Sequence, residues 1–256
     1  MTLPAYVLAL LAANLREHYS NAGRALIFAG FMFAQNLIFF LAWVFFFGSV
    51  GEVQGWRLQD VSMLYGFLAF AFGVALFLCD GIRTLPLCIQ DGSLDALIVR
   101  PRHPLPALMF SRSSVSSLGD VLSAPLYWFV FGGLTVDRLP VLLGVALLAA
   151  AVLQAATVLT YSVAFWLSGG GRFSDQLFEI LIIAAAVPQH GQPLGIKLVL
   201  FTAIPAGFVT LIPVSLMRNF DAWLLAGLAA AALAYAAAAV LVFNAGLKRY
   251  ISQAAS

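Results

Sequence analysis

The sequence has few charged residues: Asp, Glu, Lys and Arg make up 9% of its 256 residues, whereas hydrophobic residues make up 62%. Soluble domains carry roughly 25% charged residues, because their surfaces face water. The shortage of charge therefore argues against a soluble globular protein and indicates an integral membrane protein. The small net charge of +2 and the lack of a Lys/Arg run argue against a nucleic-acid partner.

Lysine and cysteine are scarcer still. The two lysines, Lys197 and Lys248, lie in "GIKLV" and "GLKRY". A P-loop requires Gly-Lys-Ser or Gly-Lys-Thr to hold phosphates, so we expect no ATP site of that kind in this chain. The two cysteines, Cys79 and Cys88, have no histidine or further cysteine at metal-ligand spacing. We therefore predict no metal site and no bound cofactor.

Long apolar runs are abundant. A helix needs about 20 mostly apolar residues to cross a bilayer, because every backbone polar group must be satisfied inside lipid. The runs predict an all-α membrane protein in which residues 1–256 form one transmembrane domain and residues 1–24 form an N-terminal interfacial helix. We expect six transmembrane helices, at about residues 25–47, 61–79, 106–133, 140–167, 173–187 and 222–244.

The region before the last predicted span is irregular. Residues 188–221 contain several prolines and glycines within apolar sequence, which one straight helix cannot accommodate. We predict extracytoplasmic broken helices here, of which residues 196–212 enter the bilayer without crossing it. Such backbone is tolerated at membrane depth only where protein or water covers it.

Lysine and arginine predict the orientation, because cytoplasmic loops carry an excess of both. Six spans with both termini in the cytoplasm leave only four basic residues outside, namely Arg57, Arg138, Lys197 and Arg218. The inner segments then hold Arg16, Arg24, Arg83, Arg100, Arg102, Arg112, Arg172, Lys248 and Arg249. We therefore predict that both termini are cytoplasmic.

One cytoplasmic segment, residues 86–105, interrupts the apolar runs with "QDGSLDALIVRPRHP". Asp91 or Ser93 can cap a short helix there, and Pro101 stops it at Arg100. Leu94, Leu97 and Ile98 fall at helical spacing and form one apolar face. The residues alone leave three partners open for that face: the membrane surface, another protein or the chain's own helical bundle.

Three stretches carry a resemblance that covers nearly the whole chain. They are "DGSLDALIVRPRHPL", "PLGIKLVLFTAIPAGFVTLIP" before the final span and the closing "FNAGLKRYIS". In order and spacing they resemble the permease subunits of ABC-2 type exporters, small six-span bacterial proteins that work with a separate ATPase. The resemblance implies a place in the bacterial inner membrane, as a multi-pass protein.

The resemblance also implies partners. Residues 86–105 would be a coupling segment docked on an ABC ATPase dimer, and that dimer would bind the ATP and Mg²⁺. The chain would also pair with a second permease subunit, either a copy or a paralogue, and would contact membrane lipids. The implied ATPase contacts are Asp91, Gly92, Leu94, Asp95, Leu97, Ile98, Arg100, Pro101 and Arg102. The phenylalanine-rich first two spans favour export of an apolar or amphipathic compound, such as a drug-like molecule or a lipid.

Polar residues within the predicted spans are candidates for a translocation path, namely Gln35, Asn36, Gln154 and Thr157. Hydrogen bonding between helices explains them equally without any cargo. We expect Asp120 and Glu179 near the cytoplasmic boundary. Ala69 and Gly73 form a pair of small residues that permits close helix packing.

Two other functions remain open on the sequence. A membrane-embedded structural or assembly protein would use its cytoplasmic helix to bind lipid and no ATPase. An intramembrane phospholipid synthase resembling the CDP-alcohol phosphotransferases would need an Asp-rich metal site. Asp80, Asp91 and Asp95 do not match that spacing, because Arg83 follows Asp80-Gly81 too early and no third spaced carboxylate follows.

Overall fold

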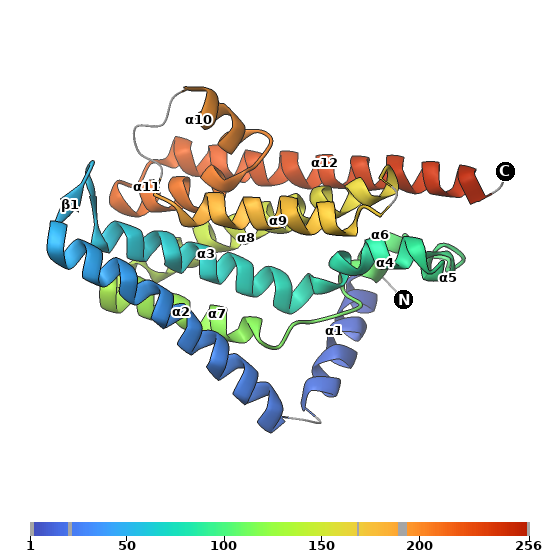
Figure 1. Cartoon of the computed structure of the whole chain (residues 1–256), viewed down its shortest axis with the longest axis horizontal. Coiled ribbons are helices and arrows are strands. Elements are labelled where there is room, and N and C mark those ends of the chain that lie inside the picture. Colours follow the sequence, from blue (N-terminus) through green and yellow to red (C-terminus); the bar gives the residue numbers. More distant parts are fainter. Residues whose placement is uncertain (1–2, 20–21, 168, 189–193, 255–256) are drawn as a thin grey trace.

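Four long helical stretches dominate the computed structural model, which describes residues 3–19, 22–167, 169–188 and 194–254 (Figure 1). They are long and apolar enough to cross a membrane and comprise residues Ala22–Val50, Leu58–Gln90, Val136–Phe165 and Ala222–Gln253. The central helices of these stretches are α2 (Ala22–Val50), α3 (Leu58–Cys79), α8 (Leu139–Ser162) and α12 (Ala222–Ala254). The predicted all-α membrane protein is therefore confirmed.

Two shorter helical segments lie alongside the long ones. The first consists of α7 (Ser117–Pro125) and the π-helical η2 (Leu126–Phe131), and the second is α9 (Gly171–Ala186). Alpha-helices of 16 residues, such as α9, extend for about 24 Å, which is less than a hydrocarbon core of about 30 Å. The number of six spans therefore stays a prediction.

The two ends of the bundle differ. One end, which we name the α5 end, holds η1 (Asp80–Thr84), α4 (Leu85–Gln90), α5 (Ser93–Ile98), α6 (Pro104–Met109) and the last turns of α12. The opposite end, which we name the hairpin end, holds the antiparallel pair of β1 (Glu52–Val53) and β2 (Trp56–Arg57) and the helix α11 (Ile212–Arg218). Helix α1 (Leu3–Tyr19) runs across the bundle direction at the α5 end, as an interfacial helix would (Figure 1).

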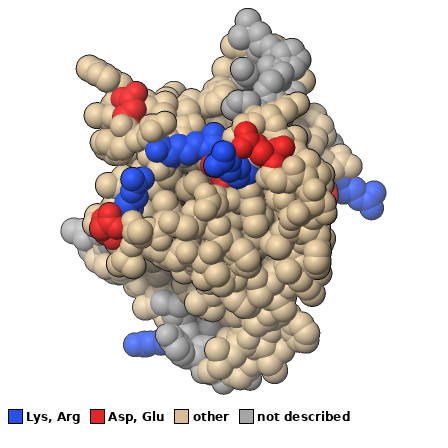
Figure 2. Space-filling model, turned by 90° about the vertical axis from the view of Figure 1, so that its left-hand side faces the viewer, with Lys and Arg blue, Asp and Glu red and all other residues tan. Residues whose placement is uncertain are grey.

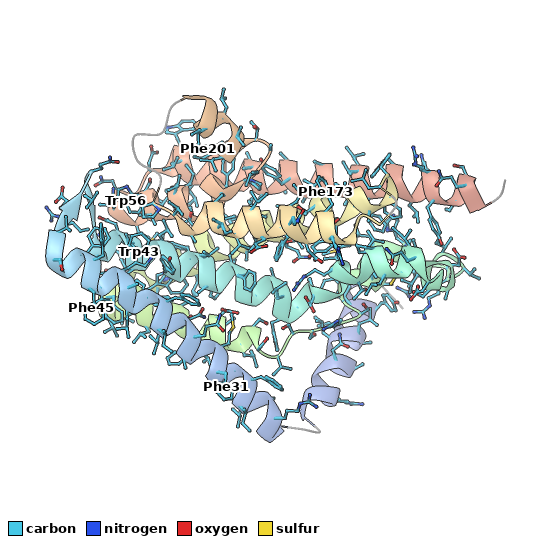
Figure 3. All side chains as sticks on the ribbon, viewed as in Figure 1. Phe31, Trp43, Phe45, Trp56, Phe173 and Phe201 are labelled. Carbon is cyan, nitrogen blue, oxygen red and sulfur yellow. The ribbon has the colours of Figure 1, made fainter. Side chains whose placement is uncertain are left out.

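Burial distinguishes inner from outer helices. In the most apolar windows of the Leu58–Gln90 and Val136–Phe165 stretches, 67% and 61% of residues are buried, against 11% in α2 and 17% in α12. Helix α3 packs on α7, α8 and η2, and α12 packs on α8. Phe31 and Phe45 point outward from α2, whereas Trp43 points toward α3 (Figure 3). The outer faces of α2 and α12 are thus left for lipid or a second subunit.

Glycines allow the inner helices to approach closely. A Cβ atom on Gly73 of α3 would meet the Val121 side chain and the Ser117 carbonyl of α7. A Cβ atom on Gly119 of α7 would meet the Ala29 carbonyl of α2. The predicted close packing at Gly73 is therefore confirmed, and α7 packs closely against both α2 and α3.

The third predicted span, residues 106–133, is not one helix. The chain instead forms α6, a non-helical stretch and then α7–η2. Serine side chains explain the break, because the hydroxyls of Ser111 and Ser117 donate to the nearby carbonyls of Leu108 and Ser114 and so offer the backbone an alternative to helix. Pro125, which lacks an N–H donor, precedes the π-helical turn.

The region after α9 consists of α10 (Leu194–Phe201), the π-helical η5 (Gly207–Leu211), α11 and the connections between them. The Thr210 hydroxyl donates to the carbonyl of Ala185 near the end of α9, 3.0 Å away, and Tyr235 of α12 donates to the Thr202 carbonyl, 2.6 Å away. Broken helices are thus present within residues 194–218. Residues 189–193 of the predicted broken region lie outside the described residues.

The last helix is longer than predicted. The sequence pattern ends a span near residue 244, but α12 continues to Ala254 through "GLKRY". Lysine and arginine are good helix formers, so the membrane boundary that they mark does not end the helix. The additional turns reach the α5 end.

Candidate functional site

The short helix α5 lies at one end of the bundle, beyond the end of α3 (Figure 1). Gly92 precedes it with φ of 73°, a left-handed conformation that glycine adopts without strain. The Asp91 carboxylate accepts a 2.9 Å hydrogen bond from the Ser93 backbone N–H. Hydrogen bonding from Ser93 also lowers the pKa of Asp91. The N-cap position is held by Gly92, so neither Asp91 nor Ser93 caps the helix as predicted, and the helix ends at Ile98, before Arg100.

The apolar face of α5 is partly covered by the chain itself. Leu94 is fully buried, and Leu97 and Ile98 are half-buried against the same core. Because α5 packs against α4 and α6, the chain itself already covers Leu94, and a contact of this residue with an ATPase stays a prediction.

The exposed surface of α5 differs from the predicted face. Val99, directly after the helix, is 85% exposed. The neighbouring exposed residues are Asp91, Asp95, Ala96, Arg100 and Pro101, while Gly92 and Arg102 are half-buried. This surface has an apolar centre at Ala96 and Val99 and charges around it, which is the pattern of a small protein interface.

Three contacts connect the α5 segment to other helices. The Asp95 carboxylate lies close enough to the Tyr250 side chain of α12 to interact with it electrostatically. Between α6 and α12, His103 Nε2 and Asn244 Oδ1 lie 2.7 Å apart. Toward α1, the Arg102 guanidinium lies 4.6 Å from the centre of the Tyr6 ring. The segment is thus joined to the last helix and to the interfacial helix.

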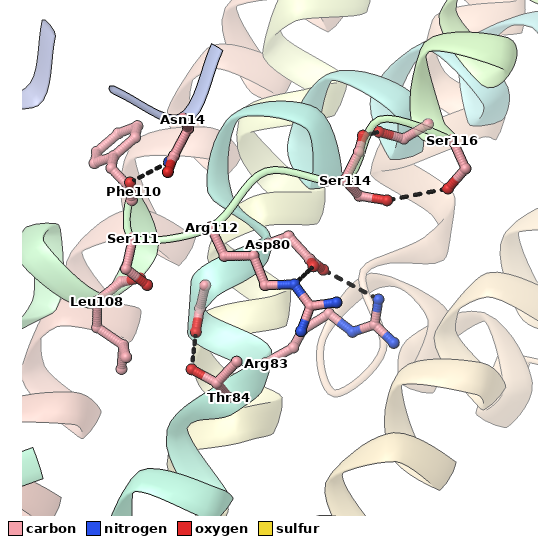
Figure 4. Close-up of polar contacts among 12 residues, drawn as sticks. Asn14, Asp80, Arg83, Thr84, Leu108, Phe110, Ser111, Arg112, Ser114 and Ser116 are labelled. Carbon is pink, nitrogen blue, oxygen red and sulfur yellow. Dashed lines mark hydrogen bonds and ion pairs between the residues drawn. The ribbon is translucent and has the colours of Figure 1, made fainter. Parts of the chain in front are cut away.

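A buried carboxylate anchors the same end of the bundle (Figure 4). Asp80, which follows α3, lies 3.2 Å from the guanidinium nitrogens of both Arg83 and Arg112. Arg112 belongs to the non-helical stretch that leads into α7. The Asn14 side chain of α1 donates a 2.8 Å hydrogen bond to the carbonyl of Phe110. These contacts hold α1, η1 and the entry to α7 together.

The network continues into the next helices through Tyr161. The Tyr161 hydroxyl accepts a 3.2 Å hydrogen bond from Arg83 Nε and donates a 2.6 Å hydrogen bond to Asp175 of α9. We did not predict this network from the sequence. The sequence pattern that indicates such a network is the acidic and basic pair of Asp80 and Arg83, which lie three residues apart at the end of an apolar run.

A second feature lies among the long helices. An open cavity of about 510 Å³ is lined by α2, α3, α7, η2 and α9, and Asn36 and Asp120 both contribute to its wall. The Asn36 side-chain amide donates a 2.7 Å hydrogen bond to Asp120 Oδ1. Asn36 therefore lines a cavity, as expected of a path residue. The hydrogen bond with Asn36 places Asp120 beside the middle of α2, and its distance from a membrane boundary stays a prediction.

The other candidate path residues lie elsewhere. Gln35 is exposed on α2, and the Thr157 hydroxyl donates within α8 to the Leu153 carbonyl. The side-chain amide of Gln154 is buried without a hydrogen-bond partner in the described part of the chain. Glu179 is exposed, halfway along α9. The structure therefore brings together Asn36 and Asp120 and does not bring Gln35, Gln154 or Thr157 to this cavity.

The hairpin end carries a band of charged side chains over a largely uncharged surface (Figure 2). Arg218 Nε donates to Asp60 Oδ1 at 2.6 Å, and Arg57 pairs with Glu52 at 2.8 Å. Within the residues described, no group of three or more His, Cys, Asp or Glu side chains is arranged to hold a metal ion.

The long apolar helices define a multi-pass membrane protein. Residues 33–254 match the family described as ABC-2 family transporter protein, and the chain belongs to this family. Membership makes it a membrane component of an ABC transporter, a kind of subunit that is generally not catalytic, and implies that it works with an ABC ATPase. Neither the curated proteins nor the solved structures gave a match.

Proposed function

We propose that this chain is the permease subunit of an ABC exporter that moves an apolar or amphipathic compound out of the bacterial cytoplasm. In this proposal, ATP and Mg²⁺ are bound by a separate ATPase dimer, and a second permease subunit packs on the exposed faces of α2 or α12. The chain then crosses the inner membrane six times, with α7–η2 and α9 as the two shorter spans.

The observation that carries the proposal is the placement of α5. This helix lies beyond the end of α3 and presents Ala96 and Val99 among charged residues. It is connected to α12 through the His103–Asn244 contact and the interaction of Asp95 with Tyr250. A partner that pushes on such a helix also moves α12. We therefore propose that ATP-driven closure of the ATPase acts on residues 91–102 and changes access to a path between the helices.

Charge supports the orientation. The α5 end carries most of the basic residues of the helical bundle, namely Arg83, Arg100, Arg102, Arg112, Arg172, Lys248 and Arg249. The hairpin end carries Arg57, Arg138 and Arg218. By the positive-inside rule the α5 end faces the cytoplasm, as do both termini, and residues 188–221 lie on the extracytoplasmic side.

The test is co-purification of the detergent-solubilised chain with its candidate ATPase. Val99→Asp places a charge at the centre of the exposed α5 surface, and we expect loss of the ATPase because an uncompensated charge disfavours an apolar contact. Val136→Asp is the matched control, since Val136 is 72% exposed near the hairpin end. Equal ATPase recovery for Val99→Asp, Val136→Asp and the unchanged protein would remove the coupling role of α5.

A further inference from the structure

The cavity between α2, α3, η2 and α9 has the size and wall of a small-molecule site. Its volume of about 510 Å³ lies within the range of about 300–1,000 Å³ that is usual for such sites. The wall is mainly apolar and includes the aromatic side chains of Phe39, Trp43, Tyr65, Phe72 and Tyr127. The Trp43 indole N–H donates to the Tyr65 hydroxyl at 2.7 Å, which fixes two of these rings.

One acid interrupts this apolar wall. Asp120 is only 3% exposed, and its Oδ1 accepts the hydrogen bond from Asn36. Its second oxygen, Oδ2, is buried and has no hydrogen-bond partner among the described residues. The described residues that line the cavity include no Lys or Arg. The carboxylate therefore has one oxygen left for a ligand and no protein cation beside it in that wall.

These features favour a positively charged ligand over a negatively charged one. A carboxylate among apolar helices attracts a cation and repels an anion strongly, because little water screens it. The faces of aromatic rings also attract cations. We infer that this cavity binds a lipophilic cation, whose charge lies at Asp120 and whose apolar body lies against the aromatic wall.

The inference rests on the proposed function, since it narrows the exported compound to a cationic one. A purely structural role for Asp120 is the alternative. The hydrogen bond between Asn36 and Asp120 joins α2 to α7, but it uses one oxygen and makes no distinction between ligands of opposite charge.

Two ions of the same shape and opposite charge distinguish a ligand-binding role of Asp120 from a purely structural role. We would measure equilibrium binding of tetraphenylphosphonium and of tetraphenylborate to the detergent-solubilised protein and to Asp120→Asn, which keeps the side-chain size. Both proteins are measured in identical micelles, so partition into detergent cancels. We expect Asp120→Asn to weaken binding of the cation about tenfold or more and to leave binding of the anion unchanged or tighter. An equal change for both ions, or no change for either, would overturn the inference.

Asp120→Glu and Glu179→Gln serve as controls. Asp120→Glu keeps the charge and should keep the preference for the cation. Glu179→Gln removes an exposed carboxylate that does not line the cavity, and it should not alter binding of either ion.

A measurement on the unchanged protein covers the case in which Asp120→Asn does not fold. Dicyclohexylcarbodiimide, an apolar reagent, modifies acids within membranes, and mass spectrometry locates the modified residue. We expect tetraphenylphosphonium to protect Asp120 and to leave Glu179 equally reactive. Protection by tetraphenylborate to the same extent would overturn the inference. These measurements need no ATPase, so their failure leaves the proposed function to be judged separately by co-purification.

Discussion

The guanidinium of Arg218 and the carboxylate of Asp60 form a 2.6 Å ion pair although the two residues are 158 positions apart in the sequence. The pair joins the end of α11 to the start of α3. The guanidinium also lies 5.0 Å from the centre of the Trp56 ring. It therefore fixes the broken region against the first half of the bundle.

We expect Arg218→Ala to lower the free energy of unfolding by about 1–3 kcal/mol, because it removes the ion-pair partner of a mostly buried carboxylate, which keeps only the hydrogen bond from the Arg57 backbone N–H. Thermal unfolding followed by size-exclusion chromatography measures the change. Arg57→Ala is the control, since the Arg57–Glu52 side chains are 70% and 48% exposed and water screens their attraction. A shift for Arg57→Ala as large as that for Arg218→Ala would contradict this prediction.

Close approach at Gly81 should make this position intolerant of any side chain. A Cβ atom there would collide with the Leu108 carbonyl and the Ser111 hydroxyl. We expect Gly81→Ala to displace α6 and to lower the apparent melting temperature. Gly144→Ala in α8 is the matched control: its Cβ meets nothing within 4 Å, so it should be neutral or stabilise by up to about 1 kcal/mol. Equal stability of the two variants would show that η1 and α6 are not in contact.

Leu94 should behave as a core residue rather than an interface residue. Its side chain is 0% exposed, so Leu94→Ala should destabilise the protein by about 2–5 kcal/mol. Leu87→Ala, at a position that is 62% exposed, should change stability by less than about 0.5 kcal/mol. Unfolding of both variants is followed in the same detergent. A stable Leu94→Ala protein that fails only to recover the ATPase would instead support the predicted ATPase contact of this residue.

The Tyr161 hydroxyl should hold α9 against α8. Tyr161→Phe removes the hydrogen bonds to Asp175 and Arg83, and we expect faster amide hydrogen exchange in residues 171–178. Tyr235→Phe is the reciprocal control, because the Tyr235 hydroxyl donates to the Thr202 carbonyl. It should speed exchange around residues 201–204 and leave α9 unchanged. If Tyr161→Phe affects both regions equally, the hydroxyl acts on the whole bundle and not on α9.

Hydropathy was sufficient to predict the long helices, because the requirement for about 20 apolar residues in lipid is strict. It failed at residues 106–133, where the overall apolar character concealed the serines that bond to the local backbone. It also placed the end of the last helix too early, since a change from apolar to basic residues marks a membrane boundary and not a helix end.

The sites were less predictable than the helices, because they depend on which segments meet. Periodicity showed that α5 has an apolar face, but only the packing of α4 and α6 shows that Leu94 is already covered. Similarly, Asn36 and Asp120 are 84 positions apart, and no local pattern indicates that they share a hydrogen bond. Asn36 lines the cavity, whereas Gln35 has the same polarity and is exposed on α2, so polarity alone does not separate the two.

The 33 residues of α12 make it about 50 Å long, which exceeds the thickness of a hydrocarbon core by about 20 Å. It packs against the shorter helix α8, while Asn244 and Tyr250 meet the α5 segment near one end. A straight helix that is held in this way transmits a displacement of one end to the other end. A small displacement of its projecting tip would turn the helix about its contacts with α8 and swing the opposite end, beside the broken helices, in the other direction.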